Sequence, residues 1–164
     1  MNTAVQSNPA AWSDTDFLAA FLDASMPAAG FDHRGHVRAT WLLLQAHPLP
    51  EAVELTCEGI ARLATRLGVP GKYHRTLSEA LVRLMAEGGA ADPAQGFEAF
   101  VRANPALMQD ARGVLARHYS PELLATEAAR LRALAAHDIR APLLLAESAG
   151  GLMTMRPPER PLPT

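Results

Sequence analysis

The chain has 164 residues, the size of one domain, and 49% of them are hydrophobic, as in an ordinary globular protein. The formal net charge of −2 and the lack of a basic stripe argue against nucleic-acid binding, and no apolar run approaches the ~20 residues of a membrane span. The N-terminus lacks the pattern of a signal peptide and Cys57 is alone, so we expect a cytoplasmic protein without an internal disulfide.

Four helices are predicted in the first half of the chain, each from an apolar stripe at helical spacing. Ser13 or Asp14 can cap the first helix and Asp32 the second, while TLSE, a capping box that begins at Thr76, opens the fourth. The third helix should end at Gly68, the usual residue after a helix C-terminus. After a flexible tail at 1–12, the expected ranges are 13–26, 33–46, 51–68 and 76–87.

Three more helices are predicted after a glycine-rich loop at 88–96, and they begin at Phe97, Pro105 and Ser120. They cover 97–104, 105–119 and 120–138, and no segment shows the alternation typical of a strand. The sequence therefore predicts an all-α, single-domain bundle of about seven helices. The helical domain should cover 13–137, with a proline-containing C-terminal extension at 138–164.

Three of the six histidines are predicted to meet at one end of this bundle. At about 100° per residue, His33 and His36 fall on the same face of the second helix as Val37 and Leu44, which should be buried. Short links favour antiparallel neighbours, so the second and fourth helices should begin at the same end. His74 lies just before the fourth helix and should therefore lie near the other two histidines.

Three neutral imidazoles with an open position are a typical catalytic ligand set for a divalent transition metal such as Zn, Fe or Cu. The leading hypothesis is a metal-dependent enzyme that acts on a small-molecule substrate, with His33, His36 and His74 as metal ligands. Tyr73 and Arg38 would be the catalytic, substrate-contacting residues. Acid–base chemistry without a metal, or a haem held by one histidine, are alternatives.

The second hypothesis for these residues is a different class of function. In that interpretation the chain is a non-catalytic helical module that binds a small ligand or a partner protein, and the histidines only order its structure. Neither interpretation involves nucleic acid or a membrane, and the chain could form a homodimer.

Two other residues bear on these hypotheses. Lys72 is the single lysine among 15 basic residues; it could bind an anion, although a coding bias toward arginine explains its isolation as well. Cys57 lies within the apolar stripe of the third helix and is expected in the core.

The motifs FDHRGHVR with Trp41, GKYHRT and HYSPELL resemble a family of small bacterial helical proteins. Its pattern is approximately F-x-H-x-x-H-[LV]-R-x-x-W, then K-Y-H-x-T, then Y-S-x-x-x-L, and the match spans residues 17 to 130. The resemblance implies no particular activity, and residues 131–155 depart from the family's usual ending. The motif positions it marks are His33, His36, Arg38, Trp41, Lys72, Tyr73, His74, Tyr119 and Ser120.

Overall fold

The structure is a computed structural model that describes residues 8–116, 122, 125 and 126. This part of the chain consists of helices and loops without a strand, which confirms the all-α single domain. The α-helices are α1 (Asp14–Leu22), α2 (His33–Ala46), α3 (Leu49–Arg66), α4 (Arg75–Glu87), α5 (Phe97–Ala103), α6 (Pro105–Gln109) and α7 (Ala111–Ala116). The short 3-10 helices are η1 (Pro9–Ala11), η2 (Ala28–Gly30) and η3 (Pro70–Lys72).

Several predictions concern residues that are not described. The seventh predicted helix at 120–138, the extension at 138–164, and the motif residues Tyr119 and Ser120 all lie outside the described residues. None of the helices that are described is long and apolar enough to cross a membrane.

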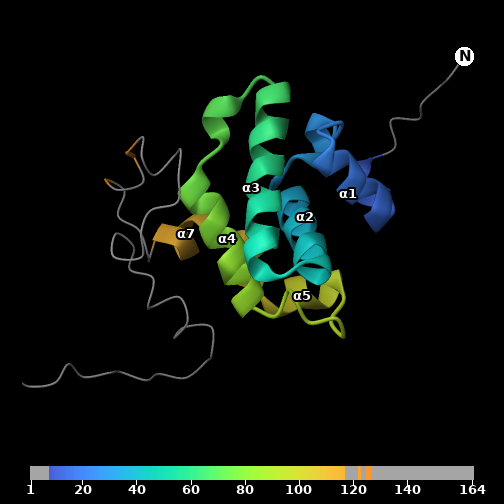
Figure 1. Cartoon of the computed structure of the whole chain (residues 1–164). Coiled ribbons are helices and arrows are strands. Elements are labelled where there is room, and N and C mark those ends of the chain that lie inside the picture. Colours follow the sequence, from blue (N-terminus) through green and yellow to red (C-terminus); the bar gives the residue numbers. More distant parts are fainter. Residues whose placement is uncertain (1–7, 117–121, 123–124, 127–164) are drawn as a thin grey trace, which may run out of the picture.

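Helix α3 is the centre of the bundle. It lies between α2 and α4, and the chain runs alternately down, up and down through these three helices, as their short links predict (Figure 1). The predicted apolar stripe of α3 is buried, and Cys57 within it is fully buried. The core is therefore built from aliphatic side chains of α2, α3 and α4, with Phe17, Phe21 and Phe100 added from α1 and α5.

Helix boundaries agree with the predictions where the expected cap forms. The side chain of Asp32 accepts a hydrogen bond from the Gly35 amide at 2.7 Å, and α2 has the predicted range. Ser13 caps α1 by accepting from the Asp16 amide at 3.1 Å. Gly68 follows the end of α3 with φ of +76°, the left-handed conformation expected there.

Other boundaries differ from the prediction, and α1 ends at Leu22, four residues before its expected end at Met26. Helix α4 is capped by His74, whose Nδ1 accepts from the Leu77 amide at 3.3 Å, so Thr76 lies inside the helix and does not cap it. The helix expected at 105–119 is divided into α6 and α7 at Asp110, whose side chain accepts from the Gly113 amide and starts a new helix.

The first turn of α2 packs backbone to backbone against η2. A Cβ on Gly35 would stand 2.0 Å from the carbonyl oxygen of Gly30, far closer than non-bonded carbon and oxygen atoms approach each other. Because the obstacle is backbone, a side chain at this position would have to displace η2 or the start of α2. Glycine at position 35 is thus a steric requirement of the fold.

We predict that Gly35→Ala lowers the free energy of unfolding by about 1–3 kcal/mol, since overpacking outweighs alanine's better helix propensity. Gly96→Ala is the matched control, because a Cβ there meets no atom within 4 Å. Urea unfolding of both variants and the wild type checks this. Equal stability of Gly35→Ala and Gly96→Ala would contradict it.

Candidate functional site

The three predicted site histidines have different partners. The Nε2–H of half-buried His33 donates to the carbonyl oxygen of Leu107 on α6 at 2.5 Å. His74 caps α4, as described above, and the ring of His36 packs edge-on against Phe31 with 4.4 Å between the ring centroids. His33 and His74 therefore help to hold helices in place. The hypothesis of a non-catalytic module expects such a structural role for all three histidines.

No group of three His, Cys, Asp or Glu side chains in the described part of the chain is arranged to hold a metal ion. The ligand set of His33, His36 and His74 therefore has no geometric support within these residues. The metal hypothesis, with Zn, Fe or Cu, stays a prediction from the sequence pattern.

His36 carries a buried polar atom without a partner. Its Nε2 is fully buried and has no hydrogen-bond partner among the described residues; Trp41 Nε1 and Thr56 Oγ1 share this condition. Burial, and secondarily the proximity of His33, lower the pKa of His36 from 6.5 to about 4, against a small opposing effect of Asp32. The imidazole is therefore neutral at pH 7.

A cavity of about 280 Å³, which we call the His36 pocket, lies against this ring. Its walls come from η2 and Phe31, from α3, and from the loop after α3 together with η3. Apart from His36 and Lys72, every lining side chain is apolar. The lining residues are Ala28, Phe31, His36, Ile60, Ala64, Leu67, Val69 and Lys72. The structure thus brings the single lysine of the chain to the same cavity as one of the predicted histidines.

Tyr73 belongs to a different cluster between α3 and α4. The guanidinium of Arg75 and the thiol of Cys57 are near enough to Tyr73 to affect its pKa, and Arg75 is ion-paired with Glu54 at 2.5 Å. Burial raises the pKa of Tyr73 and raises that of Cys57 to about 11. Both side chains therefore stay protonated at neutral pH, and neither lines the His36 pocket.

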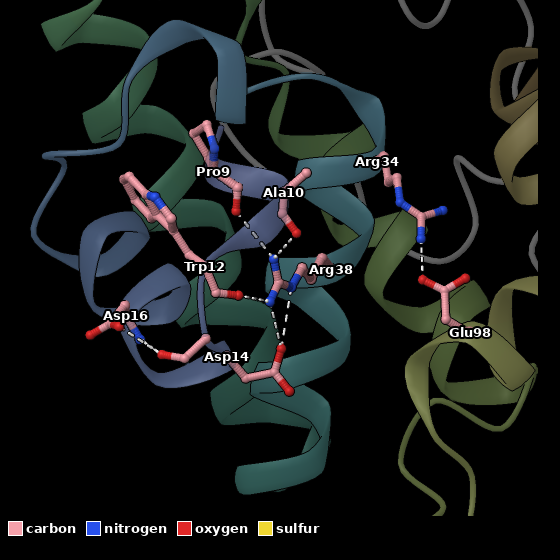
Figure 2. Close-up of polar contacts among 9 residues, drawn as sticks. Pro9, Ala10, Trp12, Asp14, Asp16, Arg34, Arg38 and Glu98 are labelled. Atoms are coloured by element: carbon pink, nitrogen blue, oxygen red, sulfur yellow. Dashed lines mark hydrogen bonds and ion pairs between the residues drawn. The ribbon is translucent and has the colours of Figure 1, made fainter. Parts of the chain in front are cut away.

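Arg38, the second predicted catalytic residue, fastens the N-terminal segment to α2. Its side chain is 13% exposed, and it donates to the carboxylate of Asp14 and to the carbonyl oxygen of Trp12, both at 2.8 Å. Longer contacts of 3.4 and 3.5 Å reach the carbonyl oxygens of Pro9 and Ala10 (Figure 2). Arg38 is therefore not part of the pocket at His36.

The face of α2 that carries Arg38 borders a second and larger cavity of about 680 Å³. We call it the arginine cleft, because Arg34, Arg38 and Arg102 line it together with the rings of Phe17 and Phe97. Arg34 and Arg102 were not singled out from the sequence, since arginine makes up all but one of the 15 basic residues and no local pattern separates these two.

Comparison of the chain with protein-family models, with curated proteins and with solved structures finds no match. The functional interpretation consequently depends on the geometry and chemistry of the two cavities.

We predict that the stability of the fold depends on pH through His36. Its pKa is lower in the folded chain than in the unfolded one, so the unfolded chain binds the proton more readily between pH 6.5 and about 4. The free energy of unfolding therefore has its full value above pH 6.5, and about 3 kcal/mol of it is lost as the pH falls to about 4. Urea unfolding across this range should show a smaller loss for His36→Gln than for the wild type. Parallel pH profiles of the two proteins would contradict the prediction.

Proposed function

We propose that this chain binds a small molecule with an apolar body and one carboxylate group in the His36 pocket. The observation that carries the proposal is the buried Nε2 of His36, which has no partner among the described residues although its ring lines a cavity. Neither Trp41 nor Thr56, whose side chains also carry an unpaired buried atom, lines this pocket.

The unpaired nitrogen gives a reason for a ligand to bind. A buried polar group without a hydrogen bond costs about 1–3 kcal/mol, and a ligand oxygen that bonds to Nε2, once the ring has turned to bring this atom to the pocket, would remove that cost. A neutral imidazole can either donate or accept through Nε2, depending on its tautomer. A carboxylate oxygen fits the tautomer in which Nε2 carries the hydrogen.

The remaining lining defines the other parts of the ligand. Lys72 is exposed at the pocket and offers three donors and a positive charge, which suits a carboxylate. The apolar side chains, Ile60 and Leu67 among them, suit a hydrocarbon chain or ring. A volume of about 280 Å³ is larger than the ~150 Å³ cavity known to accept benzene, so an organic acid of several carbons fits.

Binding is better supported than turnover at this pocket. As a catalyst, His36 would have to accept a proton, and a pKa of about 4 makes it a weak base near neutral pH. The metal-dependent enzyme suggested by the histidine motif remains a second hypothesis for the function. The homodimer and the cytoplasmic location also remain predictions from the sequence.

The proposal is tested with hexanoate as the ligand and hexanol as its uncharged counterpart. Hexanoate should cause saturable amide NMR shifts at Phe31, Ala64 and Val69. His36→Phe, which keeps a ring but removes the nitrogen, should weaken hexanoate binding about tenfold while leaving the protein at least as stable.

Lys72→Gln should weaken hexanoate binding several-fold without changing hexanol binding, because only the charged ligand uses the ammonium group. The matched control is Arg83→Gln, which removes an exposed positive charge from α4 outside the His36 pocket. The proposal is wrong if hexanoate gives no saturable shifts, or if His36→Phe binds it as well as the wild type does.

A further inference from the structure

The arginine cleft is separate from the His36 pocket and shares no lining residue with it. We propose that this cleft is a second binding site, for a planar aromatic molecule that carries one carboxylate or phosphate group. Its volume of about 680 Å³ lies within the ~300–1,000 Å³ typical of small-molecule sites. Its walls are the segment from Asn8 to Phe17, the η2–α2 junction, and α5.

The charges that line the cleft leave one arginine available. Asp14 is paired with Arg38, Glu98 is paired with Arg34, and Asp32 accepts the amide hydrogen that caps α2. Arg102, exposed in the last turn of α5, makes no hydrogen bond or ion pair with the part of the chain that the structure describes. The three carboxylates of the lining balance its three arginines in formal charge, but Arg102 is the one of these arginines that has no carboxylate partner among the described residues, so its guanidinium can bind a negative group of a ligand.

Of the two aromatic rings of the cleft, Phe17 is buried and Phe97 is half-buried, so Phe97 is the ring that a ligand can reach. The guanidinium of Arg38 lies 4.3 Å from the centroid of the Phe17 ring, and that of Arg34 lies 5.2 Å from the centroid of Phe97. Phe97 is further held by Trp41, with 5.6 Å between the ring centroids. The exposed guanidinium of Arg34 and the ring of Phe97 can both stack against a flat ligand, which favours an aromatic molecule over an aliphatic one.

One wall of the cleft is rigid and the opposite side is adjustable. Arg38 is nearly buried and held by several oxygens, whereas the side chains of Arg34 and Glu98 are 44% and 65% exposed (Figure 2). An exposed ion pair contributes little to stability, so Arg34 can exchange Glu98 for the negative group of a ligand at low cost. Arg34 and Arg102 together could then hold a carboxylate or phosphate.

Titrations with phenyl phosphate and benzoate, followed by amide NMR, test this inference. Either compound should give saturable shifts at the amides of Gly35, Phe97 and Ala99. Tighter binding of phenyl phosphate would indicate a phosphate ligand, and tighter binding of benzoate a carboxylate ligand. Arg102→Gln should weaken binding about tenfold, as expected for the loss of a charge-assisted hydrogen bond. Benzyl alcohol, which has the ring without the charge, should bind weakly and be insensitive to Arg102→Gln.

A control variant distinguishes binding in this cleft from anion binding at any exposed positive charge. Arg83→Gln removes a positive charge outside the cleft and should bind both compounds as the wild type does. The inference is overturned if Arg102→Gln has no effect on the shifts at Gly35, Phe97 and Ala99, if Arg83→Gln weakens binding equally, or if inorganic phosphate binds as tightly as phenyl phosphate. Because Arg102 is exposed, its variant should fold, and an unchanged melting temperature verifies this.

Discussion

The close contact between the first turn of α2 and the carbonyl of Gly30 determines the geometry of both cavities. Gly35 lies where a Cβ would be 2.0 Å from that oxygen, and its amide is also bound by the Asp32 cap. These two contacts hold the turn at one rotation about its axis. Since successive residues of a helix point about 100° apart, the same rotation directs Arg34 and Arg38 to the cleft and His36 to the opposite pocket.

The two cavities differ in how a buried ionisable side chain is accommodated. In the His36 pocket, an apolar lining removes water from the imidazole and keeps it neutral, so the exposed ammonium of Lys72 is the only charge among the lining side chains. In the arginine cleft, the guanidinium of Arg38 is nearly buried, and a carboxylate and backbone oxygens surround it in place of water. Burial decides the protonation state in one cavity, and paired charges compensate for burial in the other.

Local signals in the sequence predicted the positions of most helices in the described part of the chain but not the arrangement of the site. The cap at Asp32 and the apolar spacing gave α2 its observed range, and Val37 and Leu44 are buried as predicted. The two histidines of that helix nevertheless contact different neighbours, because His33 reaches Leu107, which is 74 residues away in the chain. Which element covers each ring is a tertiary question that spacing along one helix does not answer.

The free-energy cost of burying His36 Nε2 without a hydrogen bond links the folding of the chain to the proposed ligand binding. Edge-on packing against Phe31 recovers part of what the ring loses on burial, since such aromatic pairs are worth about 0.5–1.5 kcal/mol. It supplies no conventional hydrogen bond to Nε2, and a phenylalanine would pack at this position without that cost. The free protein therefore carries an unfavourable term that a ligand oxygen removes on binding. That term adds to the affinity for a molecule with an oxygen at this point, and an otherwise similar hydrocarbon gains nothing from it.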